Sequence, residues 1–200
     1  MSQSHTAVTQ ATPQWLPASR AARVTLSVIA GSALLAISAH VSVPLFITPV
    51  PFTLQPMAVL LLGLLLDPAV AFATLAAYLL EGAAGLPVFA PVGLGGAFAL
   101  LGPSAGFLWA YPLAVVLVSK LYRSGRAKTF TWAALAATAG AIVYFTGGAL
   151  WFAVTLHQSL GISLKMTVWP FVAGDALKVV LAAAIVTGLY RLRTRTGVEA

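Results

Sequence analysis

Two residues of opposite charge, Asp175 and Lys178, lie inside a long apolar stretch near the end of the sequence. Residues three positions apart share one face of a helix, so these two side chains can contact each other. If the stretch crosses a bilayer, each charge costs about 2.5–3.5 kcal/mol at the helix centre, and such residues usually serve a ligand or an ion. The simpler alternative is an ion pair that only fixes helix packing. The pair is the first candidate for a binding site.

Two further polar side chains, Glu81 and Gln55, lie at the ends of other apolar stretches. A polar group there is also typical of a helix end at the membrane surface. Convergent polar groups inside an apolar, aromatic pocket are nevertheless the usual composition of a small-molecule site. Aromatic residues also form belts at membrane boundaries, so each one is a weaker candidate. Those available to line a pocket are Trp109, Tyr111, Tyr144, Trp151 and Trp169.

Several kinds of chemistry lack the residues that they need. The sequence has no G-x-x-x-x-G-K-[ST] phosphate loop, so the chain carries no ATPase of its own. Its three histidines are scattered, it has no H-E-x-x-H motif and it has no cysteine, so we expect no metal site. No serine or threonine is accompanied by a His and Asp set that suggests a triad. We expect a binding or transport protein without a cofactor, and not an enzyme.

The composition excludes a soluble globular fold. Of the 200 residues, 60% are hydrophobic and only 8% are charged, and the mean hydropathy is +0.96. A soluble domain has about a quarter charged residues, so this chain cannot cover itself with a water-compatible surface. A span needs about 20 mostly apolar residues, which leaves room for six spans with short connections. The sequence therefore predicts an all-α membrane protein with six transmembrane helices.

Six apolar runs define the predicted spans, and proline and glycine interrupt the chain between several of them. We expect residues 1–22 to form a flexible cytoplasmic tail, residues 23–192 the six-helix substrate-binding domain, and residues 193–200 a second cytoplasmic tail. The runs cover residues 24–43, 54–66, 69–80, 107–121, 131–156 and 168–190.

The cations predict which helix ends face the cytoplasm. Nine of the eleven lie in three clusters: before the first run, between the fourth and fifth, and after the sixth. Such clusters are typical of topology signals and not of a nucleic-acid surface, and cytoplasmic loops carry the excess of lysine and arginine. All three clusters are cytoplasmic only if residues 54–80 form a helical hairpin that turns at Asp67-Pro68, and not one bent helix. Both termini are then cytoplasmic.

This topology leaves segments 44–53, 82–103 and 157–167 on the external side, above Asp175 and Lys178. The first two are rich in proline or glycine and have almost no charge. Irregular backbone is tolerated near membrane depth only where protein buries it or where it lines a cavity. We expect a folded cover over the charged pair. The alternative is a set of hydrophobic turns at the level of the lipid headgroups.

Three segments together resemble the BioY family, the biotin-specific substrate-binding (S) components of energy-coupling factor (ECF) transporters. Residues 49–55 read P-V-P-F-T-L-Q and contain a V-P-F-T-L-Q signature. Residues 78–90, Y-L-L-E-G-A-A-G-L-P-V-F-A, resemble the family pattern Y-L-x-x-G-x-x-G-L-P-V-F-A. Residues 171–178, F-V-A-G-D-A-L-K, resemble F-x-x-G-D-x-x-K. The resemblance extends over about residues 24–190.

The resemblance implies an ECF S-component fold in a prokaryotic plasma membrane, with biotin bound near the external face beneath a loop. It also implies that Asp175 and Lys178 are substrate ligands. Biotin carries a carboxylate, a ureido group and an apolar bicycle, which the other polar and aromatic candidates suit. The complete predicted site comprises Phe52, Gln55, Glu81, Phe89, Tyr111, Asp175 and Lys178, and the lid loop includes Leu86, Pro87, Gly95 and Gly96.

The resemblance further implies a membrane scaffold subunit and a pair of ATPase subunits, which alone would use ATP. In S components, small residues at A-x-x-x-A spacing in the first helix contact the scaffold, and Ser32 and Ala36 are the nearest match here. Some family members are thought to work alone as oligomers. A solitary biotin carrier, facilitated or proton-coupled through Glu81 or Asp175, is therefore one alternative. An S component for another vitamin and a structural membrane scaffold are two more. We expect membrane lipid around the chain and no nucleic acid.

Overall fold

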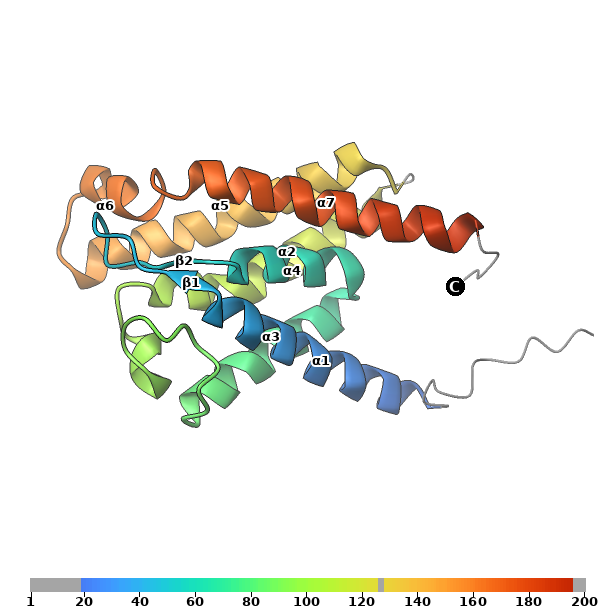
Figure 1. Ribbon diagram of the computed structural model, residues 1–200, viewed down its shortest axis with the longest axis horizontal. Coiled ribbons are helices and arrows are strands. Elements are labelled where there is room, and N and C mark those ends of the chain that lie inside the picture. The colour runs from blue at the N-terminus through green and yellow to red at the C-terminus, as the bar shows by residue number, and fades with distance from the viewer. Residues whose placement is uncertain (1–18, 126–127, 196–200) are drawn as a thin grey trace, which may run out of the picture.

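The computed structural model describes residues 19–125 and 128–195, and this part of the chain is almost entirely helical (Figure 1). Two two-residue strands pair antiparallel between the first two helices, and a short 3₁₀ helix precedes α4. The elements are α1 (Arg20–His40), β1 (Ser42–Val43), β2 (Phe52–Thr53), α2 (Gln55–Leu65), α3 (Pro68–Ala83), η1 (Gly96–Leu100), α4 (Ala105–Ser124), α5 (Phe130–Thr155), α6 (Leu160–Thr167) and α7 (Val172–Arg195).

Each of the six predicted apolar runs contains a helix, which confirms the all-α membrane fold. Helices α1, α4, α5 and α7 are long and apolar enough to cross a bilayer, whereas α2 and α3 are shorter. The chain reverses direction between α2 and α3, as the predicted hairpin requires (Figure 1). Proline lies in the first turn of both helices, where its missing N–H costs nothing.

One helix differs from the sequence prediction. Segment 157–167 was expected to be an external connection, but it contains α6. The side chain of Ser159 accepts a hydrogen bond from the backbone N–H of Ile162 and so caps this helix. Eight residues, one of them Lys165, are too few to give an apolar run that predicts a span.

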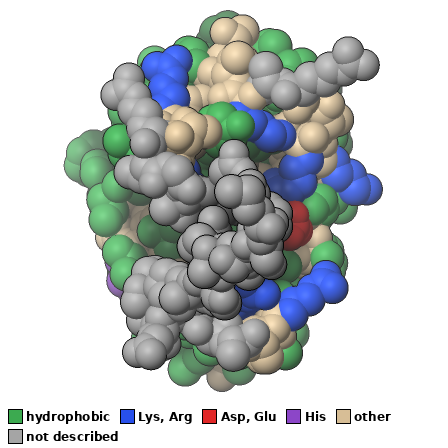
Figure 2. All heavy atoms as spheres, turned by 90° about the vertical axis from the view of Figure 1, so that its right-hand side faces the viewer, with side chains coloured by type: hydrophobic (Ala, Val, Ile, Leu, Met, Phe, Trp, Pro, Cys, Tyr) green, Lys and Arg blue, Asp and Glu red, His purple; other side chains and the backbone are tan. Residues whose placement is uncertain are grey.

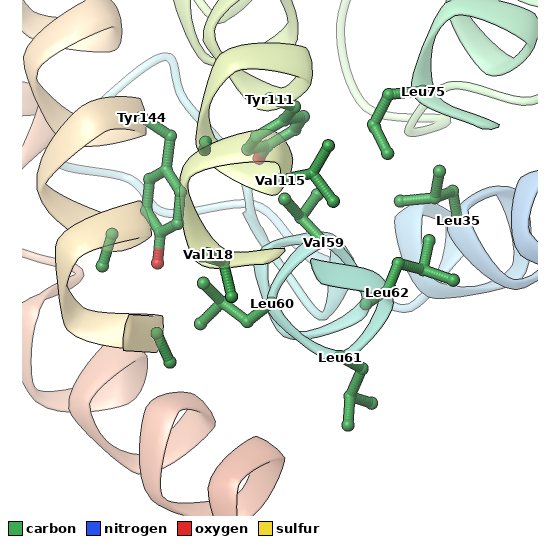
Figure 3. Packing of buried hydrophobic residues seen from close by; sticks show 14 of the residues in the cluster. Leu35, Val59, Leu60, Leu61, Leu62, Leu75, Tyr111, Val115, Val118 and Tyr144 are labelled. Atoms are coloured by element: carbon green, nitrogen blue, oxygen red, sulfur yellow. The ribbon is translucent and has the colours of Figure 1, made fainter. Parts of the chain in front are cut away.

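Helix α2 occupies the centre of the bundle. Nine of its eleven residues are buried, and it packs against α1, α4, α5 and α7. Figure 3 shows Leu62 pointing toward Leu35 of α1 and Leu60 toward Val118 of α4. A helix that is apolar all round is expected at such a position. At about 16 Å it is too short to cross the membrane alone, and the extended chain around β2 precedes it.

Glycines allow neighbouring helices to approach closely. A Cβ atom added at Gly147 of α5 would lie 2.6 Å from the Cβ atom of Ala110 in α4. One added at Gly63 of α2 would lie 2.8 Å from the Cβ atom of Val118. Small residues bring backbones together in this way in membrane bundles, where burial of apolar surface against lipid gives little driving force.

The two ends of the bundle differ in charge. One end, here called the cationic end, carries the start of α1, the ends of α4 and α7 and the α2–α3 turn (Figure 1). Lysine and arginine side chains gather along the upper and right-hand parts of this end in Figure 2. By the positive-inside rule this end is cytoplasmic. Arg126 lies outside the described residues, as do residues 1–18 and 196–200 of the two predicted tails.

The opposite end, here called the outer end, carries β1, β2, α6 and the long connection from α3 to α4 (Figure 1). The three segments predicted to lie on the external side therefore gather at one end of the molecule. Helix α7 begins at this end, so its first two turns, which contain Asp175 and Lys178, lie in the outer half of the bundle.

Candidate ligand-binding site

The charged pair of α7 is buried inside the bundle. Asp175 is 4% exposed and Lys178 is 3% exposed, and Lys178 Nζ lies 2.5 Å from Asp175 Oδ1. Tyr144 of α5 donates a hydrogen bond from its hydroxyl to Asp175 Oδ2, at 2.8 Å. Asp175 also lies in the first turn of α7, where the helix dipole favours a negative charge. The carboxylate is therefore stabilised from three directions.

Lys178 has a second partner on its other side. Its Nζ atom lies 3.9 Å from the centroid of the Phe52 ring, which is a cation–π contact. That ring is stacked on Phe171 with the planes only 5° apart and the centroids separated by 6.2 Å. The absence of a side chain at Gly174 leaves room for Phe52, because a Cβ atom there would overlap the ring. Strand β2 thus places the ring of Phe52, which is stacked on Phe171, against the ammonium group of Lys178.

A pocket of about 800 Å³, counted with its opening, lies beside the pair. Three stretches of chain enclose it together with α7, Phe145 of α5 and Phe171: residues 49–56, the connection between α3 and α4, and the first turns of α4. Apolar side chains make up most of the lining, four prolines and five aromatic residues among them, and its polar members include Gln55, Asp175 and Lys178. This combination of an apolar enclosure with a few buried polar groups suits a small organic ligand.

Gln55 reaches the pocket from the first turn of α2 and is 4% exposed. Its Nε2 donates to the hydroxyl of Tyr78 at 3.1 Å, and that hydroxyl donates in turn to the carbonyl of Val88 at 3.0 Å. Tyr78 of α3 therefore holds both the glutamine and the start of the α3–α4 connection. The buried chain of hydrogen bonds fixes one wall of the pocket.

The connection at residues 84–104, here called the lid segment, is held by three aromatic donors. Besides Tyr78, Trp109 Nε1 donates to the carbonyl of Leu100 and Trp151 Nε1 donates to that of Gly102, each at 3.0 Å. These donors come from α3, α4 and α5. Irregular backbone near membrane depth needs such partners, because lipid offers none. The lid segment is therefore anchored near both ends.

Phe89 is the buried aromatic side chain of the lid segment. Its ring meets that of Tyr78 edge to face, with centroids 5.3 Å apart. It also covers Gly82 so closely that a Cβ atom there would overlap the ring. Beyond it, residues 91–95 are exposed, and Gly93 adopts a φ of 110°, which favours glycine. The exposed part of the lid segment forms the outer edge of the pocket.

The structure brings together five of the seven predicted site residues. They come from α2, the lid segment, α4 and α7, and all are buried. The Phe52 ring contacts Lys178 Nζ but does not line the pocket. The five that line the pocket are Gln55, Phe89, Tyr111, Asp175 and Lys178.

Glu81 lies apart from this group. Its Oε2 accepts a hydrogen bond from the hydroxyl of Ser32, which ties α3 to α1. Ser32, predicted to face a partner, is only 2% exposed, and Ala36 is partly buried against the core. Of the predicted lid residues, Leu86, Pro87 and Gly95 are exposed, and Gly96 adopts a φ of 56°.

Sequence reasoning did not single out Tyr78 or assign a contact to Tyr144. Both tyrosines lie in apolar runs and are fully buried. A buried tyrosine hydroxyl needs a hydrogen-bond partner, so a tyrosine inside an apolar run was the sequence signal that could have indicated both contacts. Among the described residues, no group of three or more His, Asp or Glu side chains is arranged to hold a metal ion.

The chain is similar to one known protein family and to several of its members over most of its length. Residues 7–195 match the model of the BioY family. The "Biotin transporter BioY" of Thermotoga maritima is 34% identical over 161 residues, which cover 80% of this chain and 92% of that protein. "Biotin transporter BioY2" of Lactococcus lactis subsp. cremoris is 31% identical over 166 residues, covering 83% of this chain and 89% of the relative.

A solved structure has the same fold. It is the crystal structure of the S-component for biotin from an ECF-type ABC transporter, and it superposes with a TM-score of 0.79. The match covers 88% of this chain and 95% of the solved one, at 25% sequence identity. The family match, the relatives and the fold agree with the three motifs found in the sequence, and this chain belongs to the BioY family.

Proposed function

We propose that this protein takes up biotin as the S component of an ECF-type transporter and binds it in the pocket beneath the lid segment. The curated relatives are named as biotin transporters, and the solved relative is an S-component for biotin. The observation that carries the proposal is the buried Asp175–Lys178 pair in the wall of that pocket, at the outer end of the bundle.

The pair retains hydrogen-bonding capacity for a ligand. An ammonium group has three donors, and Lys178 uses one on Asp175. A carboxylate accepts about four hydrogen bonds, and Asp175 receives one from Lys178 and one from Tyr144. Asp175 can therefore accept a ureido N–H of biotin, while Lys178 donates to the ureido carbonyl or to the carboxylate.

The remaining lining suits the apolar part of biotin. Phe89 and Tyr111 bring aromatic surfaces from the lid segment and from α4. Gln55 can both donate and accept through its amide, and Tyr78 restricts its orientation. We propose that these three side chains enclose the bicycle of biotin. The Phe52 ring does not contact biotin in this arrangement and instead makes the cation–π contact with Lys178.

Transport requires partners in this proposal. A membrane scaffold subunit and two ATPase subunits would supply the energy, because this sequence has no phosphate loop of its own. The solved relative comes from a transporter of the ECF type, which supports the same arrangement here. Closure of the lid segment would enclose biotin before the S component reorients.

Calorimetric titration of the purified protein tests the proposed ligand. We expect biotin to bind with a one-to-one stoichiometry, and thiamine and riboflavin to give no saturable heat. The other vitamins test the shape and polar groups of the pocket on the same preparation. Equal binding of thiamine or riboflavin would contradict biotin specificity.

Uptake assays test the proposed partners. Cells that contain only this chain should accumulate little biotin, and coexpression of a scaffold and its ATPases should restore uptake. Full uptake by the chain alone that an uncoupler abolishes would instead support a proton-coupled carrier. Glu81→Gln is the variant to compare in that case, since it removes the only carboxylate described in α3.

A further inference from the structure

Three tyrosines are buried around the proposed biotin pocket: Tyr78 of α3, Tyr111 of α4 and Tyr144 of α5. The hydroxyl groups of two of them are bound to the protein. Tyr78 donates to the carbonyl of Val88, and Tyr144 donates to Asp175. The hydroxyl of Tyr111 has no hydrogen-bond partner among the described residues, although this side chain is only 3% exposed. Its hydrogen-bonding capacity is therefore left for a ligand.

The hydroxyl of Tyr111 is open to the pocket. Within residues 19–125 and 128–195, every polar side-chain atom that protein encloses completely has a hydrogen-bond partner. The Tyr111 oxygen lacks one, so it retains some accessible surface, and Tyr111 lines the pocket beside Asp175 and Lys178. A buried hydroxyl without a partner is unfavourable, and a ligand in the pocket would supply the missing partner.

The ring of Tyr111 is held in place before a ligand binds. It meets the ring of Tyr144 edge to face, with centroids 5.8 Å apart and planes inclined by 78° (Figure 3). Tyr144 is fixed in turn, because its hydroxyl lies 2.8 Å from Asp175 Oδ2. A group that is already ordered loses little conformational entropy on binding, so more of its hydrogen bond contributes to affinity.

The charge of Asp175 determines which part of biotin Tyr111 can meet. Tyr111 interacts electrostatically with Asp175, and its ring packs on the tyrosine that binds this carboxylate. Asp175 repels the carboxylate of biotin and attracts its ureido N–H groups. The ureido group therefore belongs on the Asp175 side of the pocket. Its carbonyl oxygen lies between the two N–H groups and needs a donor, which a phenol can supply.

We propose that the hydroxyl of Tyr111 donates a hydrogen bond to the ureido carbonyl of biotin, which makes Tyr111 a specificity-determining residue. This inference rests on the proposed function and adds a polar role to a side chain otherwise assigned to apolar packing. A carbonyl oxygen has two lone pairs, so Lys178 can donate to the same atom. A ligand without a good acceptor at this position leaves the phenol unpaired and is disfavoured.

Titration calorimetry of the purified full chain with biotin tests this contact. Tyr111→Phe keeps the ring and removes only the hydroxyl, so biotin should bind about tenfold more weakly. The thermal unfolding midpoint without ligand should not fall, because the hydroxyl has no partner among the described residues. The matched control is Tyr190→Phe, at a half-exposed position of α7 that does not line the pocket, and it should bind biotin like the wild type. Wild-type affinity for biotin in Tyr111→Phe would overturn the proposal.

Two biotin analogues identify the group that Tyr111 contacts. In 2-thiobiotin, sulfur replaces the ureido oxygen and accepts hydrogen bonds weakly, so Tyr111→Phe should weaken its binding less than about twofold. Biotin methyl ester keeps the ureido group but loses the carboxylate charge, and its affinity should fall about tenfold, as with biotin. An equal loss for 2-thiobiotin would overturn the ureido assignment, because a general change of the site would then explain the effect. A loss that disappears with the methyl ester would also overturn it, and would assign the hydroxyl to the carboxylate.

The same titrations separate this inference from the proposed function. A wild-type protein that does not bind biotin would contradict both, whereas wild-type binding with full affinity in Tyr111→Phe would contradict the inference alone. Circular dichroism establishes that each variant is folded. If Tyr111→Phe fails this check, Tyr111→Leu takes its place, and its loss for biotin should exceed its loss for 2-thiobiotin about fivefold. Equal losses for the two ligands would overturn the proposal.

Discussion

The outer and inner halves of the bundle bury their polar groups in different ways. In the outer half, irregular backbone and charged side chains are enclosed by protein, and tyrosine and tryptophan donors satisfy them. In the inner half, regular helices pack through glycine and aliphatic contacts, and the charges stay at the exposed end. The difference teaches that, among the described residues, the buried charged pair lies in the half whose irregular backbone is anchored by side-chain donors.

The largest effect on stability is expected at the charged pair of the outer half. Lys178→Ala leaves the buried Asp175 carboxylate without its cation, which should lower the free energy of unfolding by about 3–5 kcal/mol. Denaturant unfolding in detergent micelles measures the change. The double variant Asp175→Asn/Lys178→Ala should recover most of the loss, because no unpaired charge remains. If Lys178→Ala were as stable as the wild type, that result would contradict the burial of the Asp175 carboxylate.

The inner half should respond to added volume. In Gly63→Ala the new Cβ atom would lie 2.8 Å from Val118 Cβ, and overpacking should cost about 1–3 kcal/mol of unfolding free energy. Gly188→Ala in α7 is the control, because its Cβ atom would meet no atom within 4 Å. Alanine should stabilise that helix by up to about 1 kcal/mol. Gly63→Ala as stable as the wild type would contradict the close packing of α2 against α4.

A smaller and more local effect is expected in the lid segment. Trp151→Phe removes the donor to the carbonyl of Gly102, which should cost about 0.5–1.5 kcal/mol. Hydrogen exchange should accelerate near residues 100–104 while the inner ends of the helices keep their protection. Trp169→Phe, at an exposed side chain of the outer end, is the control and should leave the lid segment unchanged. Equally faster hydrogen exchange throughout the chain would show that the hydrogen bond of Trp151 does not stabilise the lid segment locally.

The smallest effect is expected at the cationic end. Asp67→Asn removes an ion pair with Arg123 whose side chains are 73% and 33% exposed. Such pairs contribute about 0–1 kcal/mol, and salt screens them. Thermal unfolding at low and high ionic strength should therefore separate the variant from the wild type only slightly, and least at high salt. A loss comparable to that of Lys178→Ala would remove the contrast between the two ends.

The helices and their orientation were predictable from local patterns. Long apolar runs predicted the spans, and the three cation clusters predicted which ends gather together. Helix α6 was missed because its eight residues include Lys165 and give no long apolar run. The N-cap residue Ser159 alone is a weak sequence signal for a helix, because no transmembrane run was expected to follow it directly.

The charged pair was also predictable, since Asp175 and Lys178 are three residues apart on one helix. Their remaining partners were not. The contact of Tyr144 with Asp175 joins residues 31 positions apart, and that of Gln55 with Tyr78 joins residues 23 positions apart. Such pairs depend on how whole helices pack, which no local pattern specifies. The packing of whole helices also explains why Glu81 accepts a hydrogen bond from Ser32 and does not line the pocket.

We propose that Asp175 and Lys178 bind the substrate, and calorimetry on the double variant tests this proposal most directly. Asp175→Asn/Lys178→Ala removes both charges together, so a loss of affinity is not a consequence of an unpaired buried charge. Lys165→Ala, at an exposed position of α6, is the control and should bind biotin like the wild type. The double variant should bind biotin more than tenfold more weakly, because the ureido and carboxylate groups lose their charged partners. Wild-type affinity for biotin in the folded double variant would contradict the proposal.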